Sequence, residues 1–376
     1  MIVAGEASGD LHGSHLVKEI QELNPSLKFC GIGGPELKKV GVELLYDASK
    51  IAVVGLFEVV SHLSDIITAQ KRLRERLVKN RPSLLILIDF PDFNFLLAKK
   101  AKKLGIPVFY YISPQVWAWR SGRVHTIGRL VEKIGVILPF EEQFYRDRGV
   151  DAHYVGHPLL DSVQADLTRS AFCKKYRIDP DNTLIGIIPG SRLKEIRKLL
   201  PDFISAAKLF QAQCNEKPIF LVPRASTIDE QDLRAAGIGN AQAQLDIRII
   251  SDDRYNVMAA CDAAVAASGT VTLELLLLDT PMVVTYRLAP MTYHIGKFFV
   301  KGTYFSLVNL IGDQNIVPEL LQKNVTGERI SEELFRLVFN ETAKAEMAAG
   351  FELVRDKLGQ PGASRQAAEL ALSVIE

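Results

Sequence analysis

Residues 263–274, AAVAASGTVTLE, contain the strand, turn and helix start that decide the fold. The apolar run 263–267 predicts a buried strand, Ser268, Gly269 and Thr270 predict a turn, and the Leu-rich sequence that follows predicts a helix. Such a turn leaves backbone N–H groups unpaired at a helix N-terminus, where a phosphate binds well. Glu274 lies about one turn into that helix, where a carboxylate can accept hydrogen bonds from ribose hydroxyls. The segment therefore predicts a nucleotide diphosphate pocket, with an ordinary capped strand–turn–helix as the alternative.

The same alternation of strand and helix patterns extends over all 376 residues. Many of the strands are continuous apolar runs, as expected for parallel strands covered on both faces. The fold class is therefore α/β, with two Rossmann-like doubly wound domains facing across a cleft. We expect domains at 1–160 and 161–345, followed by C-terminal helices at 346–376, whose return to the first domain is left open. The predicted strands are 2–4, 28–32, 84–88, 108–112, 133–138, 153–155, 184–188, 219–222, 247–250, 263–267 and 282–286.

Composition excludes several classes of protein. A formal net charge of +1 gives no field that would attract nucleic acid, so no nucleic-acid partner is expected. The four cysteines are far apart and lack zinc-ligand spacing, which favours reduced thiols in the cytosol. No apolar run approaches the ~18 residues that span a bilayer, although attachment to a membrane surface remains open. The seven histidines form no metal motif, and we predict no metal and no cofactor.

Polar residues follow the predicted strands of the first half, at the edge where parallel sheets bind ligands. Glu6 and Ser8 lie in a glycine-containing turn after strand 2–4 and are candidate substrate contacts, unless this is only a capped βα turn. Asp89 is the first polar residue after an apolar strand, and an acid there can act as a general base. A structural acid bonded to loop backbone is the alternative. Trp117 and Trp119 follow the next strand, where they either line a sugar site or pack under a loop.

The second half contains further candidate binding residues. Arg192 ends the turn PGSR at 189–192, which places a guanidinium beside a helix start and suits phosphate. A solvated arginine after a helix cap is the alternative. Asn309 and Gln322 are candidate ligand contacts that the pattern alone assigns to loops.

Residues 56–67 have an amphipathic helical pattern. Phe57, Val60, Leu63 and Ile67 fall on one face, and a basic run follows at 71–79. This combination can anchor a protein on anionic lipid, whereas the alternative is a helix that packs on its own sheet.

Taken together, these motifs resemble the lipid A disaccharide synthase family. The match runs in order along nearly the whole chain, and the combination is more specific than any single motif. Two positions depart from the family pattern, since Phe90 stands where the family often has Ala and Val308 where it often has Pro. The matching motifs are AGEASGD (4–10), IDFPDFN (88–94), SPQVWAWR (113–120), LPFE (138–141), GHP (156–158), IPGSR (188–192), ASGTVTLE (267–274) and PELLQ (318–322).

The resemblance implies a GT-B glycosyltransferase that joins UDP-2,3-diacylglucosamine to 2,3-diacylglucosamine 1-phosphate. The product is a β-1,6-linked disaccharide 1-phosphate, made at the cytoplasmic face of the inner membrane by a peripheral protein. Homo-oligomer formation is an open alternative. In the resulting hypothesis, Asp89 deprotonates the acceptor, Arg192 and the 268–270 turn hold the diphosphate, and Glu274 holds the ribose. A UDP-sugar epimerase of the same fold and a non-catalytic nucleotide-sugar or lipid binding protein are the alternatives.

Overall fold

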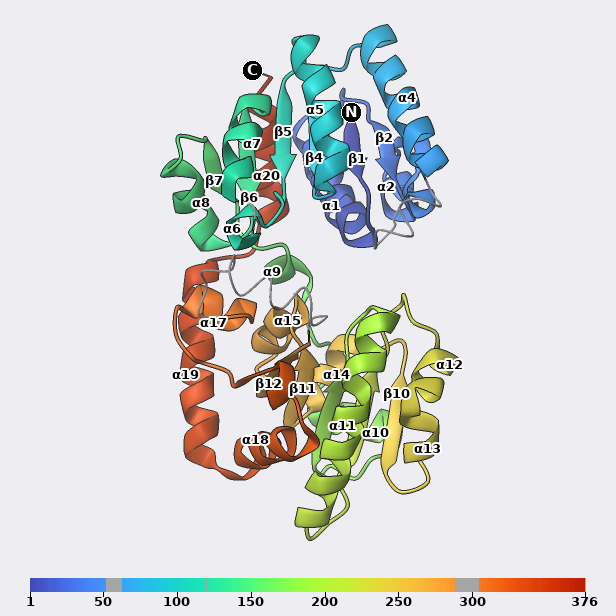
Figure 1. Cartoon of the computed structure of the whole chain (residues 1–376), viewed down its shortest axis with the longest axis vertical. Helices are drawn as coiled ribbons and strands as arrows, with labels where there is room; N and C mark the ends of the chain where they lie inside the picture. The colour runs from blue at the N-terminus through green and yellow to red at the C-terminus, as the bar shows by residue number, and fades with distance from the viewer. Residues whose placement is uncertain (52–62, 120, 288–303, 376) are drawn as a thin grey trace. The chain divides into compact units, whose positions relative to one another are not determined.

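A computed structural model describes residues 1–51, 63–119, 121–287 and 304–375. The chain divides into two compact units, Met1–Asp161 with Gln360–Glu376, and Ser162–Gly359. The first unit therefore contains both ends of the chain (Figure 1). The predicted boundary at 345/346 falls inside one continuous helix, α19 (Glu341–Leu358), which belongs to the second unit. Helix α20 (Ala363–Leu372) packs against α1 (Ala7–Leu23) in the first unit.

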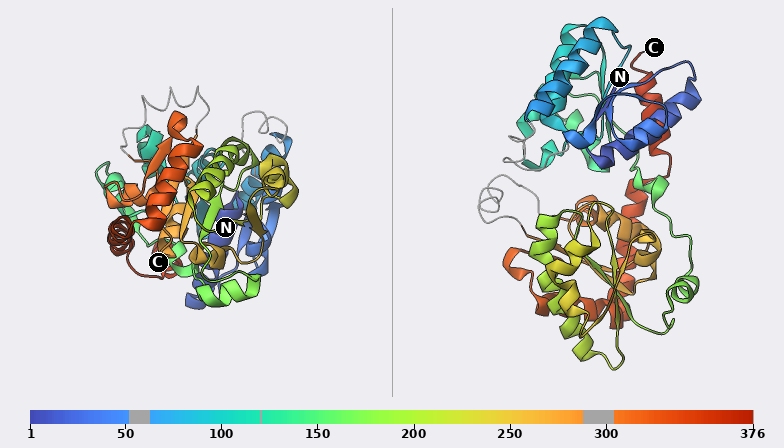
Figure 2. Two further views of the ribbon diagram at one scale, coloured as in Figure 1. Left: turned by 90° about the horizontal axis from the view of Figure 1, so that it is seen from below. Right: turned by 90° about the vertical axis from the view of Figure 1, so that its right-hand side faces the viewer.

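Unit 1 is built on a seven-stranded parallel sheet in the order β3-β2-β1-β4-β5-β6-β7. Alternate residues of its strands enter two separate cores, because successive side chains of a strand point to opposite faces. Val3, Leu85 and Leu87 pack under α4, α5 and α7, whereas Ile2 and Ile86 pack under α1 and α20. Figure 2 shows helices on both faces of the sheet. The strands are β1 (Ile2–Ala4), β2 (Cys30–Gly33), β3 (Glu43–Asp47), β4 (Leu85–Ile88), β5 (Val108–Tyr111), β6 (Lys133–Val136) and β7 (Ala152–Tyr154).

The remaining helices of unit 1 follow these strands in βαβ order. They are α2 (Pro35–Lys39), η1 (Ala48–Lys50), α4 (Leu63–Lys79), α5 (Pro91–Lys103), α6 (Val116–Trp119), η2 (Ser121–Arg123), α7 (Val124–Leu130), α8 (Pro139–Arg146) and α9 (Leu159–Ser162), the last of which ends at the boundary between the units.

Unit 2 is built on a six-stranded parallel sheet in the order β10-β9-β8-β11-β12-β13. Helices α10 and α14 cover part of one face, where their side chains join a core with Leu184, Ile219 and Leu221. Helices α11 and α18 pack on each other and contact the sheet at β11. The strands are β8 (Leu184–Ile188), β9 (Ile219–Pro223), β10 (Asp246–Ile250), β11 (Ala263–Ala267), β12 (Met282–Tyr286) and β13 (Glu319–Leu321). The helices are α10 (Arg169–Tyr176), α11 (Leu193–Gln213), α12 (Glu230–Leu233), η3 (Arg234–Ile238), α13 (Gly239–Ala241), α14 (Arg254–Ala260), α15 (Val271–Leu277), α17 (Leu307–Gly312), η4 (Gln322–Asn324) and α18 (Gly327–Phe339), with α19 completing the unit.

The predicted α/β class with two Rossmann-like domains is confirmed, and each predicted strand overlaps an observed one. Strands β3 and β13 were not predicted. Both are edge strands, and neither is a continuous apolar run, since β3 begins and ends with acids and β13 begins with one.

Each sheet has one position where the chain reverses the direction in which it adds strands. In unit 1 this switch point lies between β1 and β4, and in unit 2 it lies between β8 and β11. Ligands of open parallel sheets bind beyond the carboxyl ends of the two strands at such a point. The turns after β1 and β4 therefore define the candidate site of unit 1, and the turns after β8 and β11 define that of unit 2.

Candidate functional site

The turn after β4 holds Asp89 in a left-handed backbone conformation. Asp89 has φ of 42° and Phe90 has φ of 47°, a region that non-glycine residues occupy rarely and at an energetic cost. The carbonyl of Asp89 accepts hydrogen bonds from Asn94 Nδ2 at 2.7 Å and from the Tyr110 hydroxyl at 2.6 Å. Burial, and then the nearby Asp89 carboxylate, raise the pKa of Tyr110. These bonds fix the strained turn that presents Asp89.

The turn after β1 packs directly against the Asp89 turn. A Cβ atom on Gly5 would lie 2.5 Å from the Phe90 ring, so only glycine leaves room for the phenylalanine. Glu6, which immediately precedes α1, is half-buried, and Ser8 in the first turn of that helix is exposed. The two turns of the unit 1 switch point are therefore in contact, with Glu6 and Asp89 on adjoining segments.

The alternative of a capped βα turn does not hold for α1, because no side chain makes a capping hydrogen bond at its N-terminus. Asp10 is buried, and its carboxylate instead accepts the N–H groups of Gly34, Glu36 and Leu37 at 2.6–3.1 Å. Asp10 therefore caps α2 and ties the loop after β2 to α1.

A second buried carboxylate, Glu141, lies at the start of α8, after β6. It accepts hydrogen bonds from the indole N–H of Trp117 at 3.0 Å and from the Leu138 N–H at 3.1 Å. Burial raises the pKa of Glu141 to about 7, and these hydrogen bonds oppose the rise. Trp117 also packs edge-on against Phe140, with ring centroids 5.0 Å apart. Trp117 is thus held by a partner that the sequence pattern did not predict.

The 268–270 turn in unit 2 is the segment that the sequence predicts to bind phosphate. Ser268 donates its hydroxyl to the Phe305 carbonyl at 3.0 Å, which holds the turn in place. Gly269 has φ of 156°, and among the described residues no atom beyond its own chain neighbours lies within 4 Å of the position that a Cβ would take. Among the described residues, the N–H groups of Gly269, Thr270 and Val271 have no intramolecular acceptor. The turn therefore offers open space and unpaired donors together.

Arg192 follows β8, the other strand of this switch point. Its guanidinium pairs with Glu195 at 3.2 Å, and both side chains are exposed to solvent over half or nearly half of their surface. Exposed pairs of this kind contribute little stability, so the arginine can exchange its partner for a phosphate. Burial raises the pKa of Tyr286 at the end of β12, and Glu195 and Arg192 also act on it. Tyr286 in turn packs near Phe305, with centroids 6.2 Å apart, which links Arg192 to the Ser268 turn.

Glu274 is 6% exposed and projects from the first turn of α15. Its Oε2 atom pairs with Nη2 of Arg254, at the start of α14. Burial raises the pKa of Glu274, whereas the charge and hydrogen bond of Arg254 lower it. Sequence reasoning missed Arg254, because its only signal is an arginine that follows two aspartates after a strand.

Asn309 lies in α17, and Gln322 is the first residue of η4, directly after β13, so neither is the loop residue that the pattern predicts. The Asn309 side chain is fully buried, and its amide bonds to Val317 O, Glu319 Oε1 and the N–H groups of Ile316 and Val317. These bonds place it within the protein scaffold. Gln322 is half-buried and has φ of 52°.

Two of the four predicted membrane-contact residues are described, and Phe57 and Val60 lie outside the described residues. Leu63 is 49% exposed and Ile67 is 59% exposed, both on α4. No helix in the described ranges has the length and hydropathy needed to cross a bilayer. Within the same ranges, no three His, Cys, Asp or Glu side chains are grouped as they would be around a metal ion.

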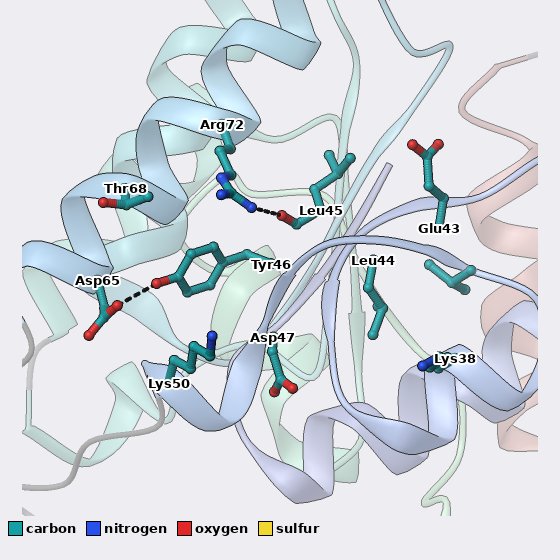
Figure 3. Close-up of a pocket in the computed structure, with 11 residues that line it drawn as sticks. Lys38, Glu43, Leu44, Leu45, Tyr46, Asp47, Lys50, Asp65, Thr68 and Arg72 are labelled. Atoms are coloured by element: carbon teal, nitrogen blue, oxygen red, sulfur yellow. Dashed lines mark hydrogen bonds between the residues drawn. The ribbon is translucent and has the colours of Figure 1, made fainter.

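A cavity of about 680 Å³ lies beside the edge strand β3 in unit 1, and its lining includes no residue from the turns of the unit 1 switch point (Figure 3). Several of its polar groups bond to each other or to neighbouring backbone, since Tyr46 donates to Asp65 at 2.5 Å and Arg72 donates to the Leu45 carbonyl at 3.1 Å. Asp47 accepts from Ser49. None of the predicted catalytic or substrate-binding residues lines this cavity, so we assign the candidate site to the switch points instead.

Comparison with known proteins decides the family. A family model described as lipid-A-disaccharide synthetase matches residues 1–374. The chain belongs to this family. Similar curated relatives are the lipid-A-disaccharide synthases of Geobacter sulfurreducens, 43% identical over 375 residues, and of Syntrophus aciditrophicus, 45% identical over 377 residues. In both comparisons the alignment covers 100% of this chain and 97% of the relative, so the family resemblance seen in the motifs is confirmed over the whole length.

Solved structures that resemble this synthetase family member share its fold at low sequence identity. The UDP-GlcNAc 2-epimerase of Neisseria meningitidis, bound to UDP-GlcNAc, has a TM-score of 0.66 at 13% identity and 99% coverage of both chains. MurG of Acinetobacter baumannii has a TM-score of 0.59 at 16% identity, with coverage of 99% of this chain and 98% of that one. The GT-B fold class is therefore confirmed, and at these identities the epimerase likeness shows the fold alone.

Proposed function

We propose that this chain transfers the diacylglucosamine group of UDP-2,3-diacylglucosamine to the 6-hydroxyl of 2,3-diacylglucosamine 1-phosphate, releasing UDP. Membership of the lipid-A-disaccharide synthetase family is the observation that carries the proposal. The two switch points add a physical basis, since one presents a carboxylate and the other presents unpaired N–H groups beside a buried acid.

The donor half of the proposed site lies in unit 2. The N–H groups of the 268–270 turn and the Arg192 guanidinium would bind the diphosphate, and Glu274 would accept hydrogen bonds from the ribose. Negative charge grows on UDP as the glycosidic bond breaks, so donors fixed in place stabilise the transition state more than the ground state. Loss of one such donor raises the barrier by about 3 kcal/mol. Gln322 is proposed to contact substrate at the end of β13. Asn309 is proposed to support the segment before β13 through its bonds to Ile316 and Val317.

The acceptor half lies in unit 1. The Asp89 carboxylate takes the proton of the acceptor hydroxyl as the oxygen attacks the anomeric carbon from the face opposite UDP. The new C–O bond forms as the bond to UDP breaks, so the configuration inverts to the β-linkage. Glu6 and Ser8 are proposed to position the acceptor, because their turn packs against the Asp89 turn through Gly5 and Phe90.

UDP release tests this function against the alternatives. The chain should release UDP only when donor and acceptor are both present, in a 1:1 ratio with a disaccharide 1-phosphate identified by mass spectrometry. An epimerase would convert the donor alone to an isomer, and a binding protein would release no UDP. Either of those results would contradict the proposed transfer.

We also propose that α4 meets the membrane surface, since both substrates have acyl chains. Leu63 and Ile67 are exposed apolar residues, and Lys71 and Arg74 lie exposed further along the same helix. Replacing Leu63 and Ile67 with Ser should reduce flotation with vesicles that contain anionic lipid. The matched control is Leu96→Ser, which removes a leucine of similar exposure from α5. Equal flotation of the double variant and this control would count against the proposed face.

A further inference from the structure

The buried carboxylate of the donor half has one cationic partner. Arg254 Nη2 bonds to Glu274 Oε2, while Oε1 of the same carboxylate accepts no hydrogen bond among the described residues. The Glu274 side chain is 8% exposed, and that of Arg254 is 39% exposed. One carboxylate oxygen is thus fixed by the arginine, and the other is left for a ligand.

The arginine occupies this place although its own hydrogen bonding is incomplete. The Nε atom of Arg254 is buried and lacks a partner within the described part of the chain. A buried donor without an acceptor destabilises a fold, so its presence in the structure calls for a compensating interaction. The bond to Glu274 is that interaction. It indicates that the Glu274 carboxylate determines where the Arg254 guanidinium lies.

The elements packed against α15 offer Glu274 few other charges. Helix α14 contributes Arg254 and also Tyr255, on whose pKa Glu274 acts by its charge. Strand β11 and helix α17 contain no titratable side chain, and Tyr286 of β12 responds to Glu195 and Arg192 instead. From α19, Arg355 bonds to the Leu276 carbonyl in the last turn of α15 and to Asp279 just after it, and no bond from Arg355 to Glu274 is among these contacts. Among the described residues of these elements, Arg254 is therefore the cation that offsets the burial of Glu274.

We propose that Arg254 is a positioning residue of the donor site, which keeps the Glu274 carboxylate ionised and turned so that Oε1 accepts the ribose hydroxyls. This inference rests on the ribose role proposed above for Glu274. Ionisation matters because a carboxylate accepts charge-assisted hydrogen bonds from both hydroxyls of a ribose, whereas a protonated carboxyl group offers fewer acceptor sites and a competing donor.

The test is the affinity for UDP, measured by calorimetry between pH 6 and pH 8.5. Arg254→Met removes the cation, so burial alone governs Glu274 and its carboxyl takes up a proton at higher pH. Below the pKa of the freed carboxyl, the ratio of the variant Kd to the wild-type Kd should grow about tenfold for each unit by which the pH falls. UDP itself titrates equally in the measurements on both proteins, so its titration cancels in this ratio. Arg254→Lys should restore an almost constant ratio.

Two further variants make the result specific. Glu274→Gln should weaken UDP binding by a factor that does not change with pH, since the amide does not titrate. Arg248→Met is the matched control, because it breaks an arginine–carboxylate pair with Asp246 on β10 and should leave UDP affinity unchanged. Thermal unfolding of each variant would show whether it is folded.

The outcomes separate the inference from the function it depends on. The positioning role is wrong if Glu274→Gln weakens UDP binding but folded Arg254→Met binds UDP with the wild-type Kd. It is also wrong if the Kd of Arg254→Met exceeds the wild-type Kd by a factor that does not change with pH. If Glu274→Gln binds UDP like the wild type, the proposed ribose contact fails as well. A pH-dependent ratio for Arg254→Met, absent from Arg254→Lys and Arg248→Met, supports the inference.

Discussion

Replacing Glu141 with Gln should remove a pH-dependent loss of stability from unit 1. Glu141 is 2% exposed, and burial raises its pKa from 4.5 to about 7. Because the folded-state pKa lies above the unfolded one, the stability that the protonated group provides is fully present below pH 4.5 and is lost as the pH rises through 7. A shift of this size corresponds to about 3.4 kcal/mol once the carboxyl is fully ionised.

The measurable part of this effect falls between pH 5.5 and pH 8.5. Over this range the linkage relation gives a loss of about 2 kcal/mol from Glu141, since about 1.4 kcal/mol of the cost is already present at pH 5.5. The difference in unfolding free energy between Glu141→Gln and wild type should therefore grow by about 2 kcal/mol in favour of the variant. Groups that titrate equally in both proteins cancel in this difference.

Urea unfolding followed by tryptophan fluorescence is a suitable assay, because both tryptophans of the chain, Trp117 and Trp119, lie in unit 1. Loss of the charged hydrogen bonds to Trp117 and Leu138 changes the stability of the variant by an offset, so the slope with pH is the decisive quantity. Glu75→Gln is a control that removes an exposed carboxylate from the same unit. Parallel stability profiles for wild type and Glu141→Gln would refute the reasoning.

Three further variants test other contacts of unit 1. Gly5→Ala should displace the turn of the proposed base Asp89 through Phe90, and so lower kcat about tenfold or more while leaving UDP affinity unchanged. Phe90→Ala should rescue this variant, and full activity of Gly5→Ala alone would contradict the contact. Burial lowers the pKa of His12 to about 4 and that of His157 to about 3. The stability that the neutral histidines provide is therefore fully present above pH 6.5 and is lost as the pH falls, by about 2 kcal/mol for each histidine at pH 5. In the Glu141→Gln background, His12→Asn should roughly halve that acid loss, and an unchanged acid profile would show that this histidine is not the source. Asp10→Ala should reduce the unfolding free energy by about 2 kcal/mol, since three N–H groups lose their acceptor; a loss below about 0.5 kcal/mol would mean that water replaces the cap.

Apolar runs predicted the buried strands well, because a strand covered on both faces must be apolar along its length. The run 263–267 coincides with β11, and the polar residues that end β4 and β11 do lie at the two switch points. Strand β3 has no such run because it forms an edge of its sheet. A pattern based on continuous apolar stretches cannot find a strand of this kind.

Partners distant in sequence were beyond the reach of the pattern. Nothing in residues 250–280 indicates that Arg254 on α14 meets Glu274 on α15, since the pairing depends on how two βα units pack. The same holds for Glu141 and Trp117, which are brought together by the neighbouring strands β5 and β6. The contact of Gly5 with Phe90 could be found only from the distance between two turns. Tertiary packing therefore determines the electrostatics of the site, although the identities of its main polar residues are visible in the sequence.

Asp89→Asn tests most directly the claim that unit 1 provides the base for a reaction of a UDP-sugar held by unit 2. The substitution keeps the size of the side chain and removes its ability to accept a proton, so UDP should bind with wild-type Kd while release of UDP from the two substrates falls to background. Asp92→Asn is the matched control, because Asp92 follows in the same segment, has a side chain that is 77% exposed and pairs with Arg123. Asp92→Asn should release UDP from the two substrates, whereas Asp89→Asn should not. Near-normal turnover in folded Asp89→Asn would contradict the assignment of Asp89 as the base.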